Sequence, residues 1–435
     1  MPELKPTPRP QATKAVKGMP DILPGVSERW QALEQAIRQV AAGSGYREIR
    51  TALMERTELF ERGVGDGTDI VSKEMFTFSK SADAESAKRL TLRPEGTAGV
   101  VRAFIEHGLS RQPKPLRLYY TGPMFRYERP QAGRQRQFHQ AGFELFGVDS
   151  PSADAELVIL AKNVLDALGV TPDLYTLHVN NVGDAATRER FSGIIREALA
   201  PHAETLCEDC QLRLQKNALR VLDCKHPNCA ALHTRLALPE QLQTSLNGKP
   251  AAEQYEATLA LLSALKIPFE RNPRLVRGLD YYTRFVFEFT VSPSAATKLG
   301  AQSTFCGGGR YNNLVSALGG PETPAVGLAF GLERLLLLMP DGCESKFAQD
   351  TAFVASVQPE NALKLAQALR KQTPGRSVLV ALEPKTIGKW LDQANKQGAV
   401  SAYLQGQDEA EQGDWLLKNL TTGQQTTLPQ TELFN

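Results

Sequence analysis

Residues 116–147 read LRLYYTGPMFRYERPQAGRQRQFHQAGFELFG and form the most informative segment of the chain. Two strand-forming runs, 116–125 and 137–146, flank a loop, so we predict a pair of antiparallel strands. Arg126 and Glu128 alternate with aromatic residues, which places them on one face of the first strand, and further arginines crowd the loop. Arginine neutralises phosphates with a fixed fork geometry and an aromatic ring can stack on a base, so the hairpin predicts a nucleotide platform. An ordinary hairpin with a solvated charged loop is the alternative.

A second segment, GLAFGLER at residues 327–334, predicts an apolar strand that runs into a helix. The first turn of this helix carries Glu333 and Arg334. An arginine in so apolar a context needs an anionic partner, because burying an unpaired charge costs several kcal/mol. The partner is either a carboxylate such as Glu333 or a phosphate from a ligand.

Three further segments carry polar residues at glycine or proline turns. LTLRPEGT (90–97) predicts a strand followed by a polar turn, and LVRGLDYY (275–282) predicts a strand broken at its glycine. GGGRY (307–311) predicts a flexible loop that delivers Arg310 and Tyr311. Each segment alone is weak evidence, because glycine-rich turns with polar tips are common in loops.

Length and composition limit the class of protein. A chain of 435 residues favours two or three domains. Hydrophobic residues make up 42% and charged residues 23%, the balance of a soluble globular protein, and no apolar stretch is long enough to cross a bilayer. The net charge of +2 does not by itself indicate a nucleic-acid-binding protein, so any polyanion site must come from local clustering.

The sequence pattern changes along the chain and predicts several parts. Residues 1–17 are rich in proline and lysine or arginine and predict a flexible basic arm. Residues 18–182 and 265–340 contain the strand-rich segments and predict one core domain. Residues 183–264 are helical and polar, without a strand signal, and predict an insertion. Residues 347–435 alternate short strands with helices, which predicts a small α/β domain with mainly parallel strands.

Six cysteines in so long a chain do not form a dense disulfide framework, so a reducing cytosol is expected and a cytoplasmic location is predicted. Cys207, Cys210, Cys224 and Cys229 form C-x2-C and C-x4-C pairs. This spacing is compatible with a tetrahedral structural zinc, and four reduced thiols in a helical insertion are the alternative.

Together, these segments in this order resemble the class II aminoacyl-tRNA synthetases, and within them the histidyl-tRNA synthetase family of bacterial type. GYREIR (45–50) followed by Glu55 resembles motif 1 of that class, FRYE (125–128) with its arginine loop resembles motif 2, and GLAFGLER resembles motif 3. LVRGLDYY and GGGRY are similar to the segments that mark the histidine-specific branch. The resemblance covers nearly the whole chain.

The resemblance implies an α+β fold: a class II antiparallel sheet flanked by helices, with a helical insertion and a C-terminal α/β anticodon-binding domain. It implies a ligase that activates L-histidine with ATP and Mg²⁺ and transfers the histidine to tRNA(His). It also implies that the protein is a homodimer and does not associate with a membrane. Because the family does not depend on a metal in the insertion, the resemblance favours reduced thiols over zinc there.

The resemblance also implies roles for individual residues. Arg277 and Arg126 are the expected catalytic residues. The expected ATP-binding residues are Arg126, Glu128, Arg134, Phe138 and Arg334. The expected histidine-binding residues are Glu95, Gly96, Thr97, Arg126, Gln140, Glu144, Arg277, Tyr281, Tyr282 and Tyr311. Among them, Glu144 and Tyr282 are expected to hold the two imidazole nitrogens.

Two positions depart from the pattern of the family. Ala52 stands where motif 1 usually has proline, and Asn312 stands where aspartate usually follows GRY. A paralogue of this family, the regulatory subunit of ATP phosphoribosyltransferase, binds ligands without aminoacylation and is the main alternative. It would be free to lose its ATP arginines, whereas this chain keeps Arg126, Arg277 and Arg334. A generic RNA-binding module, the third alternative, would need no histidine pocket.

Overall fold

The computed structural model describes residues 13–65, 68–79, 89–131, 133–224, 226–244, 246, 250–299, 303–342 and 350–433. The chain divides into two compact units, Met1–Cys343 and Glu344–Asn435. Most of the predicted N-terminal arm, residues 1–12, lies outside the described residues, as does Cys343. No helix of the described residues is both long enough and apolar enough to span a membrane.

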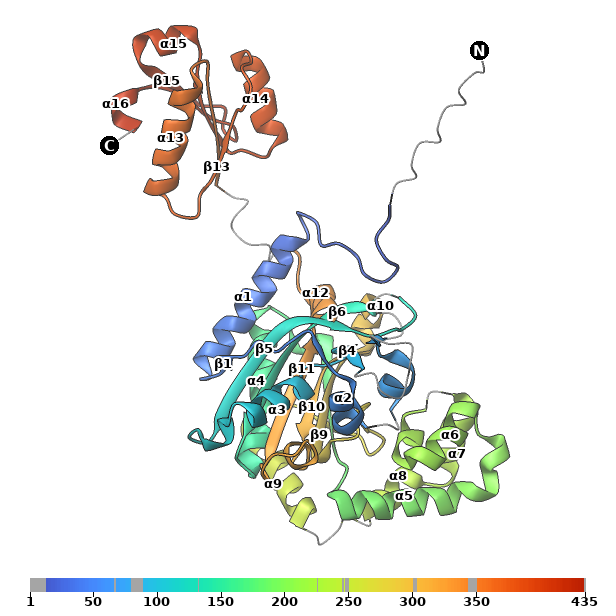
Figure 1. Ribbon diagram of the computed structural model, residues 1–435. Coiled ribbons are helices and arrows are strands. Elements are labelled where there is room, and N and C mark those ends of the chain that lie inside the picture. The colour runs from blue at the N-terminus through green and yellow to red at the C-terminus, as the bar shows by residue number, and fades with distance from the viewer. Residues whose placement is uncertain are drawn as a thin grey trace, which may run out of the picture. The chain divides into compact units, whose positions relative to one another are not determined.

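An eight-stranded sheet forms the centre of the first unit, in the order β1-β5-β6-β11-β10-β9-β7-β8 (Figure 1). The strands are β1 (Arg47–Glu48), β5 (Leu116–Phe125), β6 (Gln137–Phe146), β7 (Tyr175–Asn181), β8 (Glu270–Arg271), β9 (Thr283–Val291), β10 (Thr304–Arg310) and β11 (Ala325–Gly331). All neighbours from β5 to β7 are antiparallel, and only the short edge strands β1 and β8 pair in parallel. The predicted antiparallel strand pair is confirmed, with Leu116 opposite Phe146 and Phe125 opposite Gln137.

Helices pack on this sheet around two apolar clusters. The larger cluster joins the sheet to α1 (Ser27–Gly43), α4 (Pro151–Ala167), α9 (Pro250–Ala264) and α12 (Leu332–Leu338). The phenylalanines at 285, 287 and 289 alternate along β9, so all three point into this cluster. The second cluster joins the sheet to α3 (Thr97–Glu106) and α11 (Leu314–Ala317). The predicted antiparallel sheet flanked by helices is therefore the observed fold.

A small sheet, β2-β4-β3, and short helices complete the first unit. Its strands are β2 (Met54–Arg56), β3 (Thr77–Phe78) and β4 (Leu90–Leu92). The remaining elements are α2 (Thr57–Val64), α10 (Ala296–Leu299), and the single-turn or irregular helices η1 (Ile70–Glu74), η2 (Leu109–Arg111), η3 (Pro172–Leu174) and η6 (Pro293–Ala295).

Three local predictions were wrong, and all three concern the extent of a strand. GGGR (307–310) is not a loop but most of strand β10, hydrogen-bonded on both sides and buried. Residues 272–282 form no strand. β5 ends at Phe125, so Arg126 and Glu128 follow the strand instead of sharing one of its faces.

The region of residues 183–264 is helical, as its sequence predicts. It contains α5 (Ala185–Leu199), η4 (Ala200–Thr205), α6 (Glu208–Lys216), η5 (Ala218–Asp223), α7 (Pro227–Arg235), α8 (Leu238–Thr244) and α9. The elements from α5 to α8 share their own apolar cluster beside the sheet (Figure 1). Helix α9 differs, because Tyr255, Leu259 and Leu262 belong to the core of the large sheet.

The second unit is a five-stranded sheet in the order β13-β12-β14-β15-β16. Its elements are β12 (Thr351–Ser356), α13 (Pro359–Gln372), β13 (Ser377–Val380), α14 (Ile387–Lys396), β14 (Ser401–Gln405), α15 (Gln407–Gln412), β15 (Asp414–Asn419), β16 (Gln425–Pro429) and α16 (Gln430–Leu433). β13, β12 and β14 are parallel, as predicted, whereas β15 and β16 add an antiparallel hairpin that the sequence analysis missed.

Candidate active site

A cavity of about 320 Å³ lies over the central strands of the large sheet. Its walls come from β5, β6, β10, β11, the start of α3, the start of α12 and the irregular segment 277–282. The predicted site residues that line it are Glu95, Thr97, Arg126, Glu128, Arg134, Phe138, Gln140, Arg277, Tyr281, Tyr282, Tyr311 and Arg334. These residues span more than half of the chain, and the sheet brings them together.

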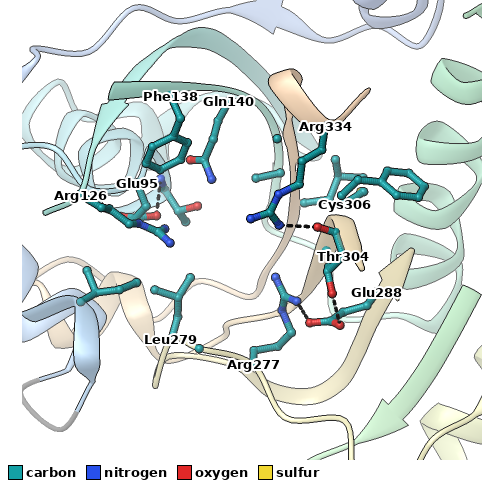
Figure 2. A pocket seen from close by; sticks show the side chains of 18 of the residues that line it. Glu95, Arg126, Phe138, Gln140, Arg277, Leu279, Glu288, Thr304, Cys306 and Arg334 are labelled. Atoms are coloured by element: carbon teal, nitrogen blue, oxygen red, sulfur yellow. Dashed lines mark hydrogen bonds and ion pairs between the residues drawn. The ribbon is translucent and has the colours of Figure 1, made fainter. Parts of the chain in front are cut away.

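Three arginines point into the cavity from different sides (Figure 2). The Nε of Arg126 donates to the Pro94 carbonyl at 2.9 Å, and its guanidinium lies 5.1 Å from the centre of the Phe138 ring. Burial lowers the pKa of Arg126. These contacts orient the guanidinium, and no carboxylate of the described residues lies at hydrogen-bonding distance from it, which leaves much of its charge for an anionic ligand.

Arg334 is held by carbonyl groups instead of by its neighbour Glu333. Its Nε donates to the Gly133 carbonyl at 2.9 Å and its Nη1 to the Thr304 carbonyl. Burial, together with the nearby Arg126 charge, lowers the pKa of Arg334 to about 10. Glu333 instead accepts from the His139 backbone at 2.9 Å. Among the described residues, Arg334 therefore forms no hydrogen bond with the neighbouring carboxylate that the sequence offered as its partner.

Arg277 has a partner that sequence analysis missed. It forms a partly buried ion pair with Glu288 of β9, and the Thr304 hydroxyl donates to the same carboxylate at 2.9 Å. Burial lowers and the Glu288 charge raises the pKa of Arg277, with a net rise. Figure 2 shows Arg277 held by Glu288 at the edge of the cavity opposite Phe138 and Gln140. The signal was present in the sequence, since Glu288 is a lone carboxylate between Phe287 and Phe289.

A buried carboxylate lies beneath the tyrosines of the cavity. Glu144 is 1% exposed, and it accepts hydrogen bonds from the Thr97 hydroxyl at 2.8 Å and from the Tyr311 hydroxyl. Burial raises the pKa of Glu144 to about 8, although both hydrogen bonds oppose the rise. A carboxyl group of this kind is a specific partner for a polar ligand group, because burial separates its oxygens from bulk water.

Glu95 caps a helix as well as lining the cavity. Its two carboxylate oxygens accept from the backbone N–H groups of Thr97 and Ala98, both at 2.8 Å, at the start of α3. The Glu95 carboxylate is therefore fixed in orientation, and burial still raises its pKa. Gly96 lies against the Tyr120 ring, where an added Cβ would be only 2.2 Å from ring carbons.

Gln140 is a polar residue of the cavity whose side-chain oxygen has no partner among the described residues. Its Oε1 is buried and accepts no hydrogen bond from the described residues. Such an atom normally costs stability unless a ligand or water satisfies it. Figure 2 places Gln140 beside Phe138 and Glu95 on one wall of the cavity.

The arginines that follow β5 are partly committed to the protein. Arg134 forms ion pairs with Glu128 and, at 3.7 Å, with Glu74. Arg136 stacks 4.1 Å from the centre of the Tyr127 ring and donates to the Glu128 carbonyl. The loop is therefore ordered by cation–π and ionic contacts instead of being simply solvated.

Arg310 does not enter the cavity. Its side chain is fully buried, and its Nε and Nη2 contact Asp154 at 2.9 and 2.7 Å. Asn312, which departs from the family pattern, accepts from the Ala325 backbone at 3.1 Å and from Arg310 at 3.3 Å. An uncharged side chain is sufficient for these contacts. The position after GRY therefore supports β11 and Arg310.

Further residues of the cavity were not found from the sequence. They include Ile70, Tyr120, Leu279, Glu288, Thr304 and Cys306. Most of them are apolar or belong to apolar strands, so only their tertiary position relates them to the site.

An antiparallel sheet with an arginine-bearing hairpin, and a strand–helix unit with an arginine in its first helical turn, is the arrangement typical of class II aminoacyl-tRNA synthetases. The model of the histidyl-tRNA synthetase family matches residues 18–335. A histidine–tRNA ligase of Synechococcus elongatus is 46% identical over 97% of this chain and 94% of its own length, and one of Desulfitobacterium hafniense is 43% identical over 96% of both chains. The crystal structure of apo S. aureus histidyl-tRNA synthetase superposes with a TM-score of 0.75 at 32% identity, covering 97% of this chain and 99% of that one. The chain belongs to the histidyl-tRNA synthetase family.

Proposed function

We propose that this chain is a histidine–tRNA ligase, which uses ATP to activate L-histidine and then transfers the histidine to the 3′ end of tRNA(His). One observation carries the proposal: a single cavity is lined by Arg126, Arg277 and Arg334 and also by Thr97 and Tyr311, whose hydroxyls donate to the buried Glu144 behind them. The arginines suit a triphosphate, and the carboxyl group suits the ring N–H of an imidazole.

In the first step the histidine carboxylate attacks the α-phosphorus of ATP and pyrophosphate leaves. The attacking carboxylate is already ionised at neutral pH, so no general base is needed. The site has to align the reactants and to neutralise charge on the phosphorus. We assign Arg126 to the α-phosphate, Arg334 to the γ-phosphate and Phe138 to stacking on adenine, with Glu128 and Arg134 as further ATP contacts.

Arg277 is assigned to the reacting carboxylate and α-phosphate. Its ion pair with Glu288 supports this assignment, because the pair holds the guanidinium at the cavity wall before substrates bind. A donor that is already oriented costs no reorganisation during the reaction. Glu288 is then a positioning residue, which acts through Arg277.

The histidine-binding residues divide into two groups. Glu95, Gly96, Thr97 and Gln140 are assigned to the α-amino end, where Glu95 is oriented by helix α3 and the Oε1 of Gln140 lacks a partner. Glu144 and Tyr282 are assigned to the two imidazole nitrogens, with Tyr281 and Tyr311 beside them. An analogue without a ring N–H would lack the hydrogen bond to Glu144 that histidine makes, which disfavours binding of the analogue.

Mg²⁺ belongs to the substrate in this proposal, since it enters bound to the triphosphate. Two of the carboxylates that line the cavity, Glu128 and Glu288, are each paired with an arginine, so we expect phosphate oxygens and water to supply most ligands of the ion. In the second step the terminal ribose hydroxyl of tRNA attacks the carbonyl carbon of the adenylate, so that an ester bond to tRNA forms, the anhydride bond to phosphate breaks and AMP leaves. We assign residues 18–182 and 265–340 to catalysis, 183–264 to an insertion and 347–435 to anticodon binding, in a homodimer.

Histidine-dependent exchange of labelled pyrophosphate into ATP tests the proposal. A ligase catalyses this exchange without tRNA, and it then charges tRNA(His) when tRNA is added. A regulatory subunit of ATP phosphoribosyltransferase or an RNA-binding module gives neither signal. Replacement of histidine by another amino acid is the control, and a chain that shows no exchange with histidine would refute the assignment.

A further inference from the structure

Four cysteines of the helical region come together although their pairs are far apart in sequence. Cys207 precedes α6, Cys210 lies in its first turn, Cys224 follows η5 and Cys229 lies in the first turn of α7. Their four Sγ atoms all lie within 4.8 Å of one another, and those of Cys207 and Cys224 are 3.7 Å apart. All four are free cysteines.

These distances match a tetrahedral thiolate site. With Zn–S bonds of about 2.3 Å, tetrahedral geometry sets the sulfur atoms about 3.8 Å apart. A disulfide would join only two of the four, at about 2 Å. The nearby His226 and His233 supply no ligand atom to the cluster, so the site is a set of four sulfurs with no open position. Closed sites of this kind are structural.

The surrounding backbone supports charged sulfurs. The N–H of Cys207 donates to the Sγ of Cys229, and the N–H of His226 donates to the Sγ of Cys224, both at 3.4 Å. Cys210 and Cys229 are fully buried. Backbone donors that point at sulfur stabilise a thiolate, and outer hydrogen bonds of this kind orient the ligands of a metal.

We propose that Cys207, Cys210, Cys224 and Cys229 bind one structural Zn²⁺. The sequence alone favoured reduced thiols, and the convergence of all four sulfurs, with two backbone donors, reverses that preference. Binding exchanges thiol protons for the metal: four S–H groups lose their protons to solvent, and four Zn–S bonds form.

The stretch between the two cysteine pairs, residues 211–223, reaches the catalytic part of the chain. Arg213 and Arg220 contact Asp69 at 3.1 and 3.2 Å. Arg220 also donates to the Gly278 carbonyl at 3.2 Å, and Asn217 donates to the Asp280 carboxylate. Gly278 follows the proposed catalytic Arg277 directly. The metal would therefore fix both ends of the stretch that holds the Arg277 segment, and this part of the inference rests on the proposed function.

Metal analysis of the full-length protein, purified without chelator, tests the site. We expect about one zinc per chain, and the visible absorption of a tetrahedral thiolate site after replacement by Co²⁺. The double substitution C224S/C229S should remove the metal, whereas C306S, outside the cluster, should retain it. Protein without zinc, iron in place of zinc, or a Cys207–Cys224 disulfide found by mass spectrometry would each overturn the proposal.

Hydrogen exchange tests the connection to the catalytic segment without an activity assay. Removing zinc from the wild-type protein with a chelator should increase exchange at residues 278–280 and leave exchange in strand β12 of the second unit unchanged. Unaltered exchange at 278–280 in a zinc-depleted protein would refute the connection. Zinc content and hydrogen exchange are measured without substrates. A negative result in either experiment would therefore refute the zinc site or its connection to the catalytic segment and leave the proposed ligase activity untouched.

Discussion

Replacing Glu144 by glutamine should change how the stability of the unit Met1–Cys343 depends on pH. Burial raises the pKa of Glu144 from its ordinary 4.5 to about 8, so the folded protein keeps a proton that the unfolded chain releases. Below about pH 4.5 Glu144 is protonated in both the folded and the unfolded state, so its titration does not change the free energy of unfolding. As the pH rises from there to about 8, only the unfolded state ionises, so the free energy of unfolding falls. Above about pH 8 the loss is complete.

The size of this loss follows from the pKa difference. A shift of 1 pKa unit corresponds to about 1.4 kcal/mol, so the full loss is about 5 kcal/mol and the part between about pH 5 and pH 8 is about 3 kcal/mol. Glutamine is neutral and nearly the same shape, and it keeps partners for the Thr97 and Tyr311 hydroxyls. E144Q should therefore remove this pH dependence. For the unit Met1–Cys343, the loss of about 3 kcal/mol between about pH 5 and pH 8 corresponds to a fall of roughly 5 °C in melting temperature.

The assay is thermal melting of wild-type protein and E144Q at about pH 5 and about pH 8, without substrates. The difference in melting temperature between the two proteins removes the contributions of the other titrating groups, including Asp154, because these groups are the same in both proteins. E197Q, on the exposed side of α5, is the matched control and should follow the wild type at both pH values. An equal difference between E144Q and wild type at both pH values would show that Glu144 does not titrate as a buried acid.

Four further predictions concern the site and the packing around it. R277H should slow single-turnover adenylate formation on the order of 10²-fold, with smaller changes in the dissociation constants of histidine and ATP; an unchanged chemical step would make Arg277 a binding residue only. G327A should weaken histidine binding about 10–100-fold in calorimetry, because an added Cβ would lie 1.9 Å from the carboxylate of Glu144. G331A is the control and should bind histidine normally, because its added Cβ would meet no atom nearer than 3.8 Å. R310M should cost about 3–5 kcal/mol in denaturant unfolding by leaving Asp154 unpaired, and R310M/D154L should recover part of this loss. Removal of the C-terminal unit should leave histidine-dependent pyrophosphate exchange largely intact and abolish tRNA charging; full charging by the truncated protein would refute anticodon binding by that unit.

Much of the fold was predictable because its signals are local. β5 and β6 were predicted with their observed bounds, since a strand, a turn and a return strand are contiguous and their pairing needs no distant information. The strand–helix unit at 325–338 was predictable for the same reason. The hairpin β15–β16 was missed because its short strands carry mostly polar residues, whose pattern does not distinguish a strand from a loop.

The sequence by itself determined the family and the residue types of the site, because its motifs are contiguous runs that carry arginine, glutamate and tyrosine in one order. Tertiary structure decided which of these residues meet. Tyr311 contacts Glu144 across 167 positions, and Arg310, from the same run, is directed away to Asp154. Arg277 acquires Glu288, and four cysteines from two separate pairs converge. The physical reason is that strand order places distant segments side by side, and burial then makes each polar group depend on the neighbour that the sheet supplies.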